Sequence, residues 1–189
     1  MSRLYTERKS RVIAGTTLLG ATVVVLDWLS KIFSLKVPFP ILVNLKFDVI
    51  GIPAVMAYLL FGPLSGVVAC LVAFLSISFR NPFSGFMKGL AELATVIGAF
   101  LILRVKSPPV LHKYKKIFAG ISSVALRVVT MAVAIVLFIP TWIVYLPAIC
   151  LFNAIQGTIS IAGGFLVYEA ILLRLPSLRA ARTETKKII

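Results

Sequence analysis

Acidic residues and histidine are scarce in this sequence, which has six Asp and Glu and one His among 189 residues, against 20 Lys and Arg. Enzymes that act at a membrane surface gather several such side chains for metal binding or acid–base chemistry. The acids here are scattered, and His112 stands alone in a basic stretch. A small lipid-modifying membrane enzyme is therefore only a lesser alternative, and we expect no catalytic residue, metal site or cofactor.

Cysteine is also scarce, with Cys70 and Cys150 each inside an apolar stretch. This placement disfavours a disulfide framework, and we expect both residues to pack as small apolar side chains. The sequence also lacks the G-x-x-x-x-G-K-[ST] loop that cradles nucleotide phosphates, so it should not bind ATP by that motif.

Charged residues are few overall, and long apolar runs separate them. The chain is 60% hydrophobic and 14% charged, with a mean hydropathy of +1.04, whereas a soluble domain is about a quarter charged. One crossing of a bilayer needs about 20 apolar helical residues. The composition predicts an all-α integral membrane protein forming a single domain over residues 1–189. The six transmembrane helices are expected at about 12–33, 49–61, 63–79, 86–103, 117–139 and 146–173.

Basic residues collect on alternate joints between these segments, which predicts the orientation in the membrane. If both termini are cytoplasmic, the inner segments hold fourteen basic residues and the outer segments five, as the positive-inside rule requires. The basic N-terminus (1–11) and the basic tail (174–189) would then lie in the cytoplasm. The inner residues are Arg3, Arg8, Lys9, Arg11, Arg104, Lys106, Lys113, Lys115, Lys116, Arg174, Arg179, Arg182, Lys186 and Lys187, and the outer ones are Lys31, Lys36, Lys46, Arg80 and Lys88.

Ionisable groups inside or beside the spans are costly unless they are paired or hydrated, so each is a candidate functional group. We expect Asp27 at the membrane interface, and Glu169 within reach of water or a neighbouring Arg. Arg127 could pair with Glu92 or line a hydrated cavity. The full set is Asp27, Asp48, Glu92, Arg127 and Glu169.

Two further groups of polar residues have helical spacing. Lys88, Glu92 and Thr95 would share one helix face, with a surface Lys88–Glu92 pair as the simplest interpretation. In the last span a polar stripe recurs every three or four residues. It could join helices to one another or present amides to a polar ligand. The stripe is Asn153, Gln156, Gly157 and Ser160.

Three stretches in this order resemble the substrate-binding S components of energy-coupling factor (ECF) vitamin transporters, and most closely their riboflavin-specific branch. The stretches are Leu45-Lys46-Phe47-Asp48 with Ile52-Pro53-Ala54, Gly89-Leu-Ala-Glu92-Leu-Ala-Thr95, and Phe152-Asn153-Ala-Ile-Gln156-Gly157 with Tyr168. Gln156 stands where that branch usually has Lys, and Ile135 where it has a polar amide. An S component for a different vitamin or precursor therefore remains an alternative.

The resemblance implies a protein of the prokaryotic plasma membrane that binds its substrate without chemical change. The loop after the first helix would cover a pocket between the outer halves of the fourth, fifth and sixth helices. The partners would be a transmembrane coupling protein and two ATPase subunits, with no nucleic acid, and the transported ligand would be riboflavin. The implied substrate contacts are Leu45, Lys46, Phe47, Asp48, Glu92, Thr95, Asn153 and Gln156, and the implied partner-docking residues are Thr16, Thr17, Gly20 and Ala21.

Overall fold

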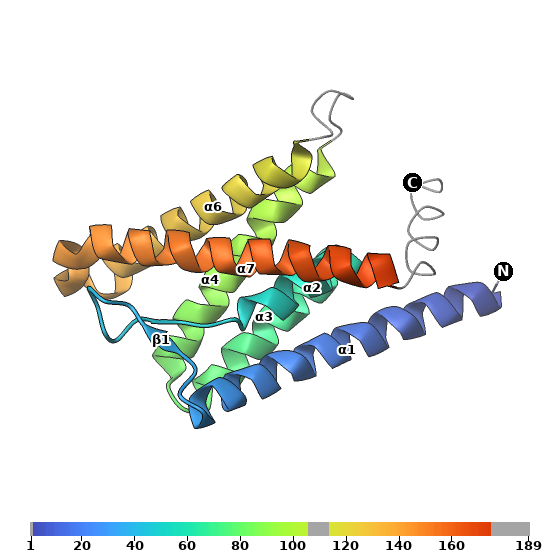
Figure 1. Ribbon diagram of the computed structural model, residues 1–189, viewed down its shortest axis with the longest axis horizontal. Helices are drawn as coiled ribbons and strands as arrows, with labels where there is room; N and C mark the ends of the chain where they lie inside the picture. Colours follow the sequence, from blue (N-terminus) through green and yellow to red (C-terminus); the bar gives the residue numbers. More distant parts are fainter. Residues whose placement is uncertain (1, 106–113, 175–189) are drawn as a thin grey trace.

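The computed structural model describes residues 2–105 and 114–174, and within them the chain forms six α-helices and one short β-hairpin (Figure 1). The basic tail (174–189) lies outside these residues, apart from Arg174. The helices are α1 (Ser2–Ile32), α2 (Gly51–Phe61), α3 (Pro63–Ser78), α4 (Pro82–Arg104), α6 (Lys115–Phe138) and α7 (Leu146–Arg174), with strands β1 (Val37–Pro38) and β2 (Lys46–Phe47) and a 3-10 helix η1 (Pro140–Tyr145).

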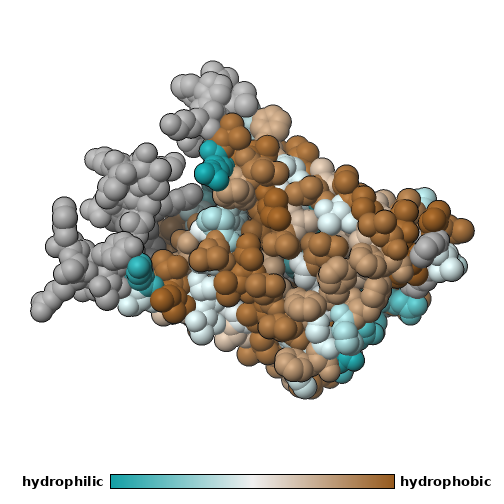
Figure 2. Space-filling model, turned by 180° about the vertical axis from the view of Figure 1, so that it is seen from behind, coloured by the Kyte–Doolittle hydropathy of each residue, from teal (hydrophilic) through white to brown (hydrophobic). Residues whose placement is uncertain are grey.

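Four helical segments are long and apolar enough to cross a membrane, and they lie in α1, α4, α6 and α7. At about 1.5 Å per residue, the 11 residues of α2 and the 16 of α3 are shorter than a hydrocarbon core about 30 Å thick. Apolar side chains cover much of the face seen in Figure 2. The predicted all-α membrane fold of six helices is confirmed, with α2 and α3 shorter than a full crossing.

Local sequence signals explain where the helices begin. Gly62 has a φ of +101°, a conformation that suits glycine, and Pro63 then starts α3. The Asn81 side chain accepts a hydrogen bond from the Ser84 N–H at 2.9 Å and caps α4. Because of this cap, α4 starts at Pro82, four residues before the predicted position. Helix α1 also starts early, because it continues through the basic N-terminal segment.

Packing centres on small side chains from α2, α3 and α4. Ala54, Ala57, Ala69, Cys70 and Ala99 are almost fully buried in one cluster. Helix α4 lies against α3 and α6, and α7 lies against α2 and α6. As predicted, both cysteines are free, although Cys150 is only partly buried.

The loop after α1 crosses the molecule and enters α2. Ser34, with a φ of +51°, follows the end of α1. In the hairpin Val37 pairs with Phe47, and Pro38 pairs with Lys46. Pro38 and Pro40 lie in this loop, and proline favours extended backbone. Figure 1 shows this loop near the end of the molecule opposite the start of α1.

Candidate ligand-binding site

The polar stripe of α7 faces the protein interior. Asn153, Gln156 and Ser160 are at most 3% exposed, so the prediction that these residues share one helix face is confirmed. Asn153 donates a hydrogen bond to the Ile149 carbonyl at 2.9 Å. The stripe therefore brings side-chain amides into a buried region, where they need partners.

Gln156 finds its main partner in the loop after α1. Its Nε2 donates to the Asp48 carbonyl at 2.7 Å, and its Oε1 accepts from the Asp48 N–H at 3.1 Å. One amide thus satisfies both backbone groups of a loop residue. The Asp48 carboxylate in turn accepts from the Ile50 N–H at 3.2 Å. Gln156 therefore fastens the loop to α7 where the chain enters α2.

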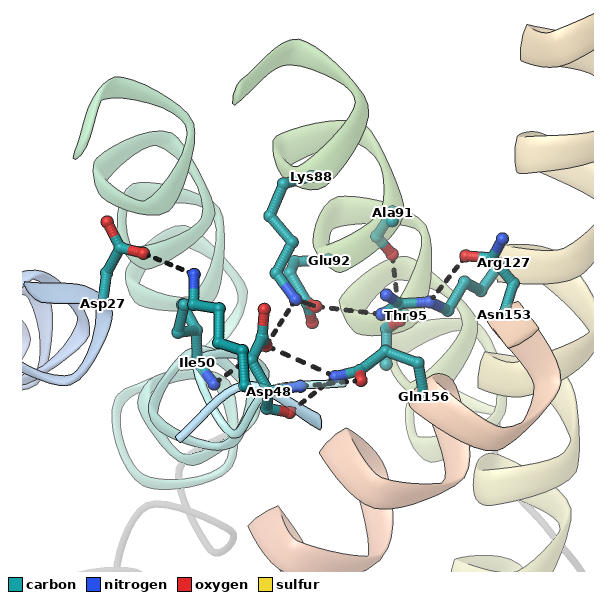
Figure 3. Close-up of polar contacts among 11 residues, drawn as sticks. Asp27, Asp48, Ile50, Lys88, Ala91, Glu92, Thr95, Arg127, Asn153 and Gln156 are labelled. Carbon is teal, nitrogen blue, oxygen red and sulfur yellow. Dashed lines mark hydrogen bonds and ion pairs between the residues drawn. The ribbon is translucent and has the colours of Figure 1, made fainter. Parts of the chain in front are cut away.

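Four charged side chains form a chain of ion pairs beside this contact (Figure 3). Lys88 lies 2.7 Å from Asp48 and 2.9 Å from Glu92, measured between nitrogen and oxygen. Glu92 also pairs with Arg127 at 3.0 Å. Two cations and two anions give this group no net charge. The Arg127–Glu92 pair that the sequence suggested is confirmed, and in the Lys88–Glu92 pair Glu92 is fully buried while Lys88 is partly buried.

Arg127 links this chain of charges to the amides. It donates hydrogen bonds to Thr95 at 3.2 Å and to Asn153 at 3.3 Å. The guanidinium can serve several acceptors because its five N–H groups point in fixed directions. Helices α4, α6 and α7 are thus joined through one side chain.

Among the buried side-chain oxygens of the described residues that have no hydrogen-bond partner, Glu92 Oε2 and Ser160 Oγ lie in this region. Both lie against Gly51 at the start of α2, where a Cβ atom would collide with them. A carboxylate oxygen can only accept, so Glu92 Oε2 is suited to an N–H or O–H donor. We name the polar cluster by its members Asp48, Lys88, Glu92, Thr95, Arg127, Asn153, Gln156 and Ser160.

Three aromatic rings join the hairpin to α7 beside this polar cluster. Phe47 stacks on Phe152 with a centroid distance of 4.9 Å, and Phe39 approaches the two rings at 5.7 and 5.6 Å. Phe39 is nearly buried. Of the other predicted loop contacts, Leu45 is half-buried, as Phe47 is, and Lys46 is exposed.

The structure therefore brings Asp48, Glu92, Thr95, Asn153 and Gln156 into one cluster, with Phe47 beside it. The predicted contact set omitted five neighbours: Lys88, Arg127, Ser160, Phe39 and Phe152. The sequence offered a signal for three of them: Arg127 is a cation within an apolar span, Lys88 lies four residues before Glu92, and Ser160 belongs to the polar stripe. Phe39 had no comparable signal, because its partner Phe152 is far along the chain.

Asp27 belongs to a second group of charged residues. It was expected at the membrane interface, and its side chain is fully buried within the protein. Lys36 from the loop lies 2.8 Å from it, the Ser76 hydroxyl donates to it at 3.2 Å, and Arg80 also pairs with it. Charged partners from two other segments cover the carboxylate and offset the cost of its burial.

Glu169 is exposed, and its partner is Lys116 rather than an Arg.

The small residues of α1 divide between two faces. Thr16 donates to the Ser65 hydroxyl at 2.7 Å, and Gly20 is buried near Val72. Thr17 and Ala21 are exposed. Only the second pair is therefore free within this chain to meet another protein.

Comparisons with known proteins show that the chain shares its fold with a protein of known structure. No family model matches the chain, and no curated protein matches it. A solved structure described as the S component of a bacterial ECF transporter matches with a TM-score of 0.70 and 22% identity, over 88% of this chain and 98% of that one. Together with the apolar helices, this match identifies a multi-pass membrane protein that has the fold of an ECF S component.

Proposed function

We propose that this protein is the substrate-binding S component of an ECF-type importer that takes up a vitamin. The observation that carries the proposal is the buried polar cluster beneath a loop that Gln156 fastens to α7. Such a site can capture a small molecule without chemistry on it. The fold match to an S component supports the same function.

The proposed substrate is riboflavin. The ordered sequence stretches resemble the riboflavin-specific branch, and the chemistry of the cluster suits that molecule. Its ring edge has alternating donors and acceptors, which the amides of Asn153 and Gln156 can meet. A flat ring system could also stack on the Phe47–Phe152 pair. The charge balance of Asp48, Lys88, Glu92 and Arg127 favours an uncharged ligand over a charged one.

The proposed partners are a transmembrane coupling protein and two ATPase subunits. In this proposal both termini are cytoplasmic and the whole chain is one domain. Docking would use the exposed Thr17 and Ala21 on α1, because small side chains let another helix approach closely. Thr16 and Gly20 then serve packing against α3 within the chain.

The test separates binding from transport. The purified protein should quench riboflavin fluorescence on its own, whereas uptake into cells or vesicles should require the coupling protein and ATPases. Bound ligand of another mass, with no quenching by riboflavin, would point to a different vitamin. Uptake without any coupling module would overturn the proposed function.

A further inference from the structure

The base of the hairpin is held on both sides by charged residues. Val37 pairs with Phe47 in the ladder, so Lys36 and Asp48 are the next residues outward on the two strands. Lys36 binds Asp27 of α1, and Asp48 binds Gln156 of α7. In Figure 3 Asp27 and Gln156 stand on opposite sides of Asp48. The hairpin is therefore attached to two different helices through the two sides of its base.

The Lys36 side is anchored without any help from the polar cluster. Asp27 is fully buried, and besides Lys36 it holds Ser76 at 3.2 Å and Arg80. Arg80 also lies over the Trp28 ring, 5.6 Å from its centroid. These contacts fix the Asp27 carboxylate within the packed helices, whatever occupies the candidate site.

Backbone hydrogen bonds add to this anchor. The Phe33 N–H donates to the Leu29 carbonyl at 2.9 Å, and the Leu35 N–H donates to the Ser30 carbonyl at 2.9 Å. The chain thus stays tied to the end of α1 up to the residue before Lys36.

The Asp48 side depends instead on side chains of the polar cluster, together with the ring contacts of Phe39 and Phe47 with Phe152. Its contacts are the Gln156 amide, at 2.7 and 3.1 Å, and the Lys88 amine, at 2.7 Å. A ligand that hydrogen-bonds to Gln156 or Lys88 must compete with Asp48 for them. This attachment therefore changes when the site fills or empties.

We propose that the Asp27–Lys36 pair is the fixed hinge of the hairpin and that the hairpin opens when Asp48 is released from Gln156 and Lys88 and the rings of Phe39 and Phe47 separate from Phe152. The role of this opening in admitting a ligand rests on the proposed function. The hinge itself does not, because it follows from contacts within this chain. Hinges of this kind are a few residues at the end of an element that absorb the change in backbone direction.

Helix α1 gains a second role from this arrangement. The helix that carries the exposed Thr17 and Ala21 also carries Asp27, less than two turns beyond Ala21. A displacement of α1 against α3 would pull on Lys36 and thereby on the hairpin. The hinge thus joins the proposed docking face to the loop that covers the candidate site.

Pulsed electron–electron resonance on the full-length protein in lipid nanodiscs tests the hinge without any ligand. One spin-label pair, Val25→Cys with Val37→Cys, measures the hinge-side distance between α1 and β1. The other pair, Val43→Cys with Leu151→Cys, measures the opening-side distance between the hairpin loop and α7. All four positions are exposed. The background replaces Cys70 and Cys150 with Ala, so that only the introduced thiols carry labels.

Three variants are compared. Gln156→Leu should shift the opening-side distances to longer values and leave the hinge-side distances unchanged. Lys36→Met should broaden the hinge-side distances. The control, Glu169→Gln, removes a charge from an exposed pair with Lys116 and should change neither. If Gln156→Leu fails to fold, Lys88→Met weakens the same attachment and should give the same shift.

The hinge proposal is contradicted if Gln156→Leu broadens the hinge-side distances as much as Lys36→Met does. It is equally wrong if Lys36→Met leaves them unchanged. Neither result depends on riboflavin, so a failure of the hinge is distinct from a failure of the proposed function. Conversely, a protein that binds no vitamin could still show the predicted distances.

Discussion

Gln156 and Asp48, 108 positions apart in the sequence, pair through two hydrogen bonds in which one side-chain amide meets both backbone groups of a loop residue. Within the polar cluster this is the contact between the residues farthest apart in the sequence, and it holds the loop against α7. An amide is well suited to this contact because it offers a donor and an acceptor side by side. Gln156 thus connects the loop over the candidate site to α7, which carries the buried amides.

Replacing Gln156 with Leu should weaken riboflavin binding. In the proposed complex the riboflavin ring edge would lose its amide partner, which costs about 1–3 kcal/mol and corresponds to a loss of about fivefold to a hundredfold in affinity. Fluorescence-quenching titrations measure the change. Thr158→Val on the same helix is the matched control, because Thr158 is exposed and bonds only to its own helix. Equal affinities in the wild type and Gln156→Leu would contradict the assignment.

Replacing Arg127 with Met should destabilise the protein strongly. It leaves the fully buried Glu92 with one cation instead of two, and breaking a buried ion pair from one side costs about 3–5 kcal/mol. Unfolding of the ligand-free protein in detergent measures the loss. The double variant Arg127→Met with Glu92→Gln should recover part of it, since the remaining Lys88–Asp48 pair is neutral. A double variant as unstable as the sum of both single variants would show that the two residues are not coupled.

Gly51→Ala should destabilise the start of α2. Its Cβ would collide with Ser160 Oγ and the Glu92 carboxylate, and overpacking of this kind costs about 1–3 kcal/mol. Gly120→Ala is the matched control, because no other group lies within 4 Å of a Cβ placed there. That change should stabilise α6 by about 0.5–1 kcal/mol. Equal thermal stability of the two variants would show that the contact around Gly51 is not tight.

Ala21→Trp should reduce uptake and leave riboflavin affinity unchanged. Ala21 is exposed on α1, and a large side chain there would keep a partner helix from approaching closely. Val129→Trp on α6 is the control, because Val129 is also exposed but lies on a different helix. Uptake and binding are measured on the same preparations. Full uptake by Ala21→Trp would remove this face of α1 from the docking proposal.

The features set by local sequence could be predicted, and those set by distant contacts could not. The stripe of Asn153, Gln156 and Ser160 follows from the helical period alone. The early start of α4 was also readable from Asn81 and Pro82. The burial of Asp27 could not be foreseen, because Arg80 comes from a turn 53 positions away. Lys88 was recognised as a partner of Glu92, but its contact with Asp48 depends on how the loop returns to α4.

A native mass spectrum of the purified protein, after incubation with riboflavin, tests the central claim most directly. The account predicts one riboflavin bound to each wild-type chain, and none bound to the double variant Asn153→Ala with Gln156→Ala. A wild-type protein that retains no riboflavin would contradict the assigned substrate. A double variant that retains it as well as the wild type would contradict the assigned site.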